Sequence, residues 1–161
     1  EFQPEDMEKL RLYEDALLPL HKLYSIETKL RDALKEKVWM KSGAYLVIQP
    51  TEALTVIDVN TGKCIGKKKD DKVYFKINAE AAREAARQIR LRNLSGIILI
   101  DFVNLEHKEK MQELLELFNG YLRQDPIQTT LVDMTKLQLV EVTRKKVRKP
   151  LHEAWNEKRN G

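Results

Sequence analysis

The chain has 161 residues, a single cysteine and a formal net charge of +4, from 29 lysines and arginines against 25 acidic residues. A chain of this length can fold as one domain and bury roughly 70% of its unfolded surface. The lone cysteine excludes an internal disulfide and a structural zinc site built from cysteines within the chain, and it is typical of a reducing compartment. No apolar stretch approaches the ~20 residues of a membrane span, and no signal-peptide pattern opens the chain. We therefore expect a cytoplasmic protein with no membrane partner, whose mild positive charge allows a polyanionic one.

The N-terminal part is predicted to be a helical lead-in. Residues 1–23 are charged and irregular, and two prolines limit any helix there. Ser25 is the predicted N-cap of a helix over 26–37, in which apolar residues recur at helical spacing. We assign residues 1–42 to this lead-in.

Two adjacent strands are predicted on either side of Pro50. Residues 44–49 alternate in polarity, and residues 53–59 form a β-branched run. Proline ends the first strand, so the two strands are expected to form a hairpin. The lysine-rich segment 61–71 follows, and we interpret it as a solvated loop.

The rest of the chain alternates helices and strands. The pattern predicts helices over 79–91 and 107–123, strands over 97–102, 127–132 and 137–142, and a polar tail over 150–161. The strand that follows the alanine-rich first helix is apolar without interruption, which favours a parallel, covered sheet. The predicted fold class is α/β, a mixed sheet packed by helices, with an N-terminal helical lead-in.

Two acids end apolar strands. Asp58 and Asp101 each follow aliphatic residues, where an ionised carboxylate is unfavourable unless it lies at the rim, is paired, or binds a metal. Mg²⁺ is commonly held by one or two carboxylates, with water and substrate phosphate completing its shell. Asn60 shares a strand face with Asp58 and could orient a carboxylate, a metal-bound water or a phosphate. The alternative stays open that these acids form turns or cap the next helix.

The sequence gives little support to other kinds of catalytic or cofactor site. There is no nucleophile elbow, Walker phosphate loop or glycine-rich dinucleotide turn. Cys64 has no histidine near it in sequence, so we interpret it as an unreactive thiol.

Basic residues gather in two places, the alanine-rich helix and a segment near the C-terminus. They could follow a phosphate backbone, although charged helix faces are commonly just solvated. The candidate RNA-binding residues are Arg87, Arg90, Arg92, Arg144, Lys145 and Lys146.

Four segments resemble the catalytic core of the ribonuclease E/G family. They are TEALTVIDVN at 51–60, NAEAA at 78–82, ARQIRLRNLSGIILIDF at 86–102 and LVEVTRK at 139–145. The similarity runs with little gap from about residue 12 to residue 148, and motifs of this length and order are highly specific.

The resemblance implies an Mg²⁺-dependent endoribonuclease that cuts single-stranded RNA in RNA processing and decay. Matched position by position, the family's metal-binding aspartates fall on Asp58 and Asp101 and its supporting asparagine on Asn60. It further implies that residues 43–149 form the catalytic, deoxyribonuclease-I-like subdomain, and that residues 1–42 resemble the end of a ribonuclease-H-like subdomain.

The match also has departures. The chain shows no S1 or 5′-sensor subdomain and no Cys-Pro-x-Cys zinc link, so we expect a fragment of a homo-oligomeric protein, with weak or no activity alone. Gln128 stands where the family has an arginine of the 5′-phosphate pocket, and Gln138 where it usually has glycine. The alternative function is a non-catalytic RNA-binding or scaffolding module.

Overall fold

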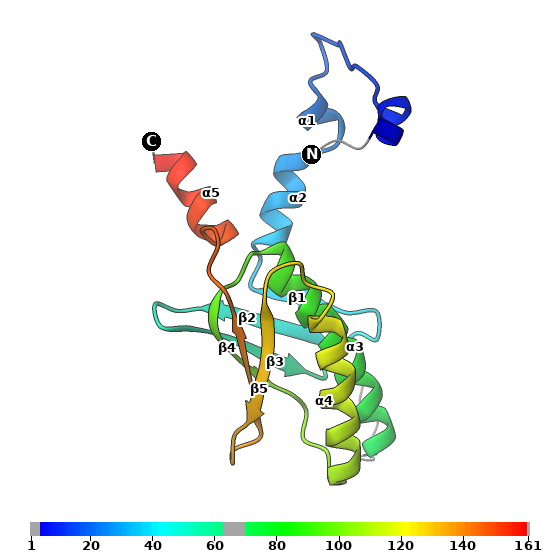
Figure 1. Ribbon diagram of the computed structural model, residues 1–161, viewed down its shortest axis with the longest axis vertical. Helices are drawn as coiled ribbons and strands as arrows, with labels where there is room; N and C mark the ends of the chain where they lie inside the picture. The colour runs from blue at the N-terminus through cyan, green and yellow to red at the C-terminus, as the bar shows by residue number, and fades with distance from the viewer. Residues whose placement is uncertain (1–3, 63–69, 161) are drawn as a thin grey trace. The chain divides into compact units, whose positions relative to one another are not determined.

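The structure is a computed structural model that describes residues 4–62 and 70–160 (Figure 1). The chain forms two compact units, residues 1–33 and residues 34–161. Cys64 and most of the predicted lysine-rich loop lie outside the described residues, so those two interpretations stay predictions.

The first unit consists of short helices. These are the 3-10 helix η1 (Pro4–Lys9), α1 (Leu20–Leu23) and α2 (Ile26–Ala33). The predicted helix over 26–37 starts correctly but ends at Ala33, because residues 37–39 belong to a strand. Ser25 has a φ of 51°, which differs from the extended backbone typical of an N-cap.

The second unit is built on a six-stranded sheet. The strand order is β1 (Lys37–Trp39), β2 (Tyr45–Pro50), β3 (Leu54–Asn60), β4 (Gly96–Asp101), β6 (Leu139–Arg144) and β5 (Thr129–Met134). Only the β3–β4 pair is parallel among these neighbours, so the sheet is mixed, as predicted. The unit begins at Leu34, so residues 34–42 with β1 join the sheet unit, whereas the sequence assigned them to the lead-in.

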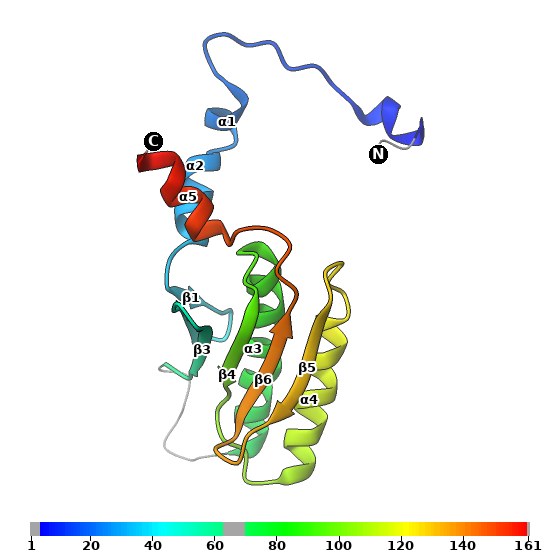
Figure 2. The same ribbon diagram turned by 60° about the vertical axis from the view of Figure 1, so that its left-hand side comes forward.

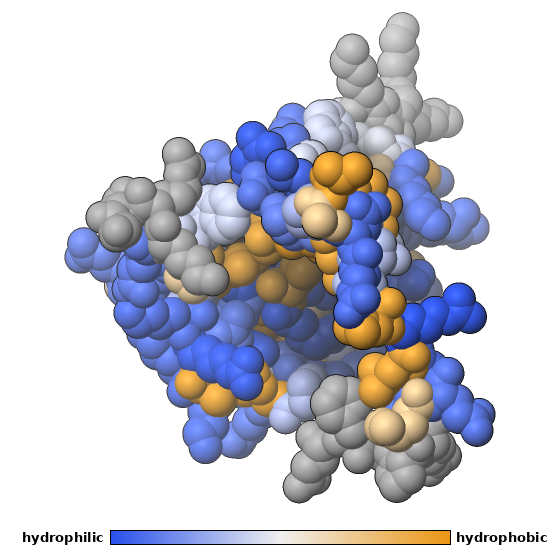
Figure 3. Space-filling view, turned by 90° about the horizontal axis from the view of Figure 1, so that it is seen from above, coloured by the Kyte–Doolittle hydropathy of each residue, from blue (hydrophilic) through white to orange (hydrophobic). Residues whose placement is uncertain are grey.

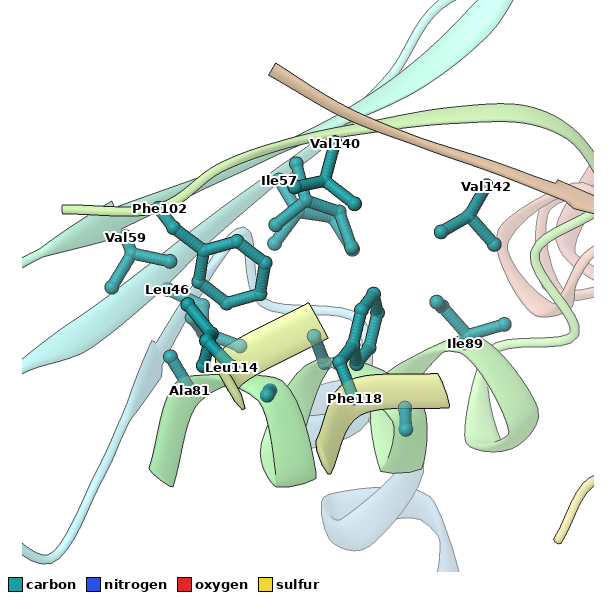
Figure 4. Close-up of a cluster of buried hydrophobic side chains, with 14 of the residues drawn as sticks. Leu46, Ile57, Val59, Ala81, Ile89, Phe102, Leu114, Phe118, Val140 and Val142 are labelled. Atoms are coloured by element: carbon teal, nitrogen blue, oxygen red, sulfur yellow. The ribbon is translucent and has the colours of Figure 1, made fainter. Parts of the chain in front are cut away.

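Two long helices cover one face of this sheet (Figures 1 and 2). They are α3 (Asp71–Leu91) and α4 (Lys108–Leu122). Helix α3 starts eight residues before the predicted position, because the Asp70 side chain accepts a hydrogen bond from the Lys72 amide at 2.8 Å and caps it. Figure 4 shows the side chains from sheet and helices that meet in the core, with Phe118 of α4 at its centre.

The opposite face of the sheet stays accessible to solvent. Along β3, residues alternate strictly between buried and half-buried positions, with Ile57 and Val59 buried against the helices. On β4, Ile97 is 50% exposed on the other face. The predicted covered sheet is therefore wrong for one of its two faces.

One face of the molecule is mainly hydrophilic (Figure 3). In the space-filling view, polar and charged side chains dominate, and hydrophobic ones gather in separate patches (Figure 3). Among the described residues, no helix has both the length and the apolar composition needed to cross a membrane.

The β5–β6 hairpin lies two residues later than predicted. The turn occupies residues 135–138, where the Gln138 amide donates to the Thr135 carbonyl at 2.9 Å. Gln138 has a φ of 66°, in the left-handed region that glycine adopts at little cost. The family resemblance placed a glycine here, and the backbone shows why that residue type suits the position.

The predicted polar tail is a helix. Residues Leu151–Asn160 form α5, and the Leu151 amide donates to the Arg92 carbonyl at 2.9 Å. The Asn93 side chain donates to the carbonyls of Arg148 and Lys149, which ties the segment before α5 to the end of α3.

A buried ion pair joins β6 to the loop after α4. Arg144 Nε donates to Asp125 Oδ2 at 2.8 Å, with side chains only 3% and 2% exposed, and Arg144 Nη1 donates to Asn93 Oδ1 and the Leu94 carbonyl. Burial alone would raise the pKa of Asp125, but Arg144, together with the Ile127 amide and a threonine hydroxyl, lowers that pKa below its usual value. The pair is therefore charged on both sides at neutral pH.

Removing one partner of this pair should be strongly destabilising. We expect Arg144→Ala to lower the free energy of unfolding by about 3–5 kcal/mol, because Asp125 would remain buried without its counter-charge. Lys145→Ala, at the exposed neighbouring position, should change it by no more than about 0.5 kcal/mol. Urea denaturation measures both, and equal effects of the two changes would contradict the assignment.

Candidate metal site

The parallel pairing of β3 with β4 brings the two predicted acids together. Asp58 and Asp101 are register partners in this pair. Neighbouring strands lie ~4.8 Å apart, and laterally paired residues project on the same face of the sheet. Both carboxylates lie on the solvent-accessible face, Asp58 half-buried and Asp101 exposed at the strand end.

Asn60 orients one of the two carboxylates. Its Nδ2 donates to Asp58 Oδ2 at 2.6 Å. The two residues are separated by one position on β3 and therefore lie on the same face. The predicted supporting role of Asn60 has this geometric basis.

The two acids are electrostatically coupled. Partial desolvation of the carboxylate at the strand end, and then the nearby charge of Asp58, raise the pKa of Asp101 above its usual value. Two ionised carboxylates in this position repel each other. A cation bound between them would remove that repulsion.

A buried asparagine in α3 fixes the chain just beyond Asp101. Asn78 is fully buried, its Nδ2 donates to the Val103 carbonyl at 2.7 Å, and its Oδ1 accepts from the Val103 amide at 3.0 Å. Both backbone groups of Val103 are thereby satisfied by one side chain. This role is not predicted from the sequence, although a lone asparagine on the alanine-rich face of a helix signals a buried polar group that needs partners.

The turn between β1 and β2 is held beside the end of β3. Glu80 of α3 accepts hydrogen bonds from the amides of Lys41 and Ser42 at 2.8 and 3.3 Å. Gly62 has a φ of 58°, and a Cβ at this position would lie 2.7 Å from the Gly43 carbonyl oxygen. Glycine is therefore required where the two loops touch, and neither this contact nor that of Glu80 is predicted from the sequence.

The donor set suits magnesium. Across residues 4–62 and 70–160, no group of three or more histidine, cysteine and acidic side chains forms a metal cage. Zinc sites need such a set, whereas Mg²⁺ accepts one or two carboxylates together with water and phosphate. Asp58 and Asp101 fit the second pattern.

Two of the predicted RNA-binding arginines are structural. Arg92 and Arg144 are each 4% exposed. Arg92 donates from Nε to Gln88 Oε1 at 2.7 Å and from Nη2 to the Lys35 carbonyl at 2.6 Å. Since both guanidiniums bind partners inside the chain, we remove them from the set of residues that face RNA.

The remaining candidates lie at the surface. Lys145 and Lys146 are exposed after β6. Arg87 forms an ion pair with Glu84 at 2.7 Å, and Arg90 donates to the Tyr121 carbonyl at 3.2 Å. Arg87 and Arg90 line a groove of about 780 Å³, whose other charged lining residues are Lys41, Glu80, Arg83 and Glu84. Cations outnumber acids in this groove, which is consistent with an anionic ligand.

Comparison with known proteins agrees with the family resemblance. The model of the Ribonuclease E/G family matches residues 1–147. The chain is 40% identical over 158 residues to ribonuclease G of Salmonella typhimurium, covering 98% of this chain and 32% of that protein. It is 40% identical over 139 residues to ribonuclease E of a Nostoc species, covering 86% of this chain and 20% of that protein.

A third relative gives the same result. Ribonuclease G of Haemophilus influenzae is 40% identical over 151 residues, which are 94% of this chain and 30% of that protein. The chain thus spans about a third or less of the length of these relatives. With the family model covering nearly all of it, the chain belongs to the ribonuclease E/G family.

Proposed function

We propose that this chain carries the metal-binding part of an Mg²⁺-dependent endoribonuclease that cuts single-stranded RNA in RNA processing and decay. One observation carries the proposal: Asp58 and Asp101 are register partners on parallel strands, with Asn60 bonded to Asp58. The names of the relatives, ribonucleases G and E, support RNA as the substrate. That the complete protein is a homo-oligomer stays a prediction.

Each of these residues would have its own role at the metal site. Asp58 and Asp101 would hold Mg²⁺ through carboxylate oxygens, and Asn60 would keep the Asp58 carboxylate in one orientation. Asn78 would prevent the chain after Asp101 from shifting. Mg²⁺, when bound, supplies an activated water and neutralises charge on the scissile phosphate.

The phosphate backbone would be attracted by the exposed cations. Lys145 and Lys146 extend from the strand next to β4, and the groove beside α3 adds Lys41, Arg83 and Arg87. Contacts of this kind position a strand without reading its sequence. The rival function, a non-catalytic RNA-binding or scaffolding module, would use the same cations but not the two acids.

Cleavage should depend on both acids. The full reading frame that encodes this chain, incubated with unstructured RNA and Mg²⁺, should cut it, and EDTA should stop cleavage. Asp58→Asn and Asp101→Asn should each reduce the rate at least about 100-fold, or ~2.7 kcal/mol of transition-state stabilisation. The double variant should lose scarcely more, because both acids serve one ion.

The matched control is Glu52→Gln, which removes an exposed acid just before β3 and should leave the rate unchanged. A folded Asp58→Asn protein that cuts within tenfold of wild type would rule out a metal ligand at this position, since only ~1.4 kcal/mol would be lost. RNA binding without any Mg²⁺-dependent cleavage would favour the non-catalytic rival.

The pH dependence of stability should reveal how unfavourable an ionised Asp101 is, first because the carboxylate is partly desolvated and second because Asp58 is close. Its folded-state pKa is raised above the usual 3.8, so the protonated form stabilises the fold, and this contribution is lost as the pH rises through the raised value. Asp101→Asn should therefore melt at a higher temperature than wild type at pH 7, and the difference should vanish below about pH 3.8.

Mg²⁺ provides the control in the same melting experiment. It should raise the melting temperature of the wild-type chain, because it binds the folded state, and should have no such effect on Asp101→Asn. An unchanged melting temperature of the variant at pH 7 would contradict a raised pKa of Asp101 in the folded state.

The salt dependence of RNA binding should report how many phosphates the protein's cations neutralise. Affinity for unstructured RNA should fall with salt with a log–log slope of about −0.7 per phosphate neutralised. Lys145→Ala and Lys146→Ala should each make this slope less steep by about 0.7 and weaken all sequences alike. Lys22→Ala, at an exposed position in the first unit, is the control. A flat salt dependence would reject the basic surface as an RNA contact.

A further inference from the structure

Three side chains of β1 and β2 form a compact cluster at one edge of the sheet. Lys37 Nζ lies 4.2 Å from the ring centroid of Trp39 and 3.5 Å from that of Tyr45. The two rings are 4.9 Å apart at their centroids and tilted by 57°. Cation–π and ring–ring contacts therefore hold the indole in one orientation. We call Lys37, Trp39 and Tyr45 the aromatic cluster.

The strand register connects the aromatic cluster to the two acids. Trp39 pairs with Tyr45, and Tyr45 pairs with Asn60. Paired residues share a face, so the cluster lies on the same solvent-accessible face as Asp58 and Asp101. With ~4.8 Å between strands, Tyr45 is one strand spacing and Trp39 about 10 Å from Asn60.

The Trp39 indole is more exposed than an aromatic ring that only packs the edge of a sheet. Trp39 is 63% exposed, although it contacts both partners. An aromatic residue that served only to pack the edge of the sheet would bury most of its ring, because burial is its main contribution to stability. Instead the ring is pre-ordered and open to a ligand.

We propose that the aromatic cluster is a base-stacking subsite, which holds a nucleobase of the RNA strand whose phosphate lies at Asp58 and Asp101. This inference rests on the proposed function in that RNA is the ligand. Every base offers a π face, so stacking on Trp39 would tolerate any sequence, and Lys37 adds a cation for a flanking phosphate. In a duplex the bases are already stacked and paired, so the subsite would also favour single strands over double strands.

Tryptophan fluorescence offers a direct test. The chain has two tryptophans, so Trp155→Phe leaves Trp39 as the only reporter. In EDTA, which prevents cleavage, an unstructured RNA oligomer should change the emission of Trp39. An oligomer of equal charge whose nucleotides lack bases should bind through its phosphates without that change. The reciprocal Trp39→Phe chain, which reports from Trp155, should show no change with either oligomer.

Affinity gives the second readout. Trp39→Ala should bind unstructured RNA about 5- to 150-fold more weakly, the range expected for losing one stacked base, whereas Trp39→Phe should keep most of the affinity. Binding of duplex RNA should not change. The matched control is Leu137→Ala, which removes an 81% exposed apolar side chain at the β5–β6 turn.

The subsite is overturned if Trp39 emission stays constant while the anisotropy of labelled RNA shows binding, or if Trp39→Ala binds as tightly as wild type. Asp58→Asn separates this outcome from failure of the proposed function. Asp58→Asn should lose cleavage in the full reading frame and keep the Trp39 signal in this chain, whereas cleavage by the full reading frame without a Trp39 signal in this chain would overturn the subsite alone.

Discussion

The hydrogen-bonded register between β3 and β4 places the carboxylates of Asp58 and Asp101 side by side. Other parts of the second unit hold these two strands in that register. A parallel pair needs a crossover, and α3 supplies it. The face of α3 toward the sheet carries small residues, and Ala81, Ala82 and Ala85 are fully buried, so the helix can lie close to both strands. The same helix sends Asn78 to the chain beyond β4 and Glu80 to the turn beside β3. One helix therefore supports both acids from behind while the opposite face of the sheet remains accessible.

Some basic residues are buried and structural, and others are exposed. At the end of β6 the alternation of side chains between the two faces of a strand decides which is which. At the end of β6, Arg144 points into the interior and binds Asp125, and the next residue, Lys145, is exposed. Arg92 is similarly enclosed, whereas Arg87 is accessible beside a groove. The charge of a buried guanidinium is taken up by its partners inside the chain, while an exposed lysine keeps its charge available to a polyanion.

Local pattern predicted most of the sheet because strand periodicity is a short-range signal. Asp58 and Asp101 are predicted at the ends of two apolar strands, and the structure pairs these strands in parallel, with Asp101 at the end of β4 and Asp58 two residues before the end of β3. What the pattern could not show was long-range pairing. Arg144 looks like a surface cation until Asp125 is seen beside it, and Arg92 binds a carbonyl 57 positions away. Helix α3 was predicted too short because Asp70, its cap, follows a run of lysines, and α5 was missed because polar composition resembled a tail.

The bidentate contact of Asn78 with Val103 affects how the acid pair can move. Strand ends normally fray, and amide hydrogens there exchange with solvent through small local openings. At the end of β4, the backbone groups of Val103 are bonded to a side chain that is itself fully buried in α3. Opening the strand end at Asp101 therefore requires disturbing the helix as well. Local fraying at Asp101 is therefore opposed by a contact that a free strand end lacks, and the spacing of the two carboxylates is restrained accordingly.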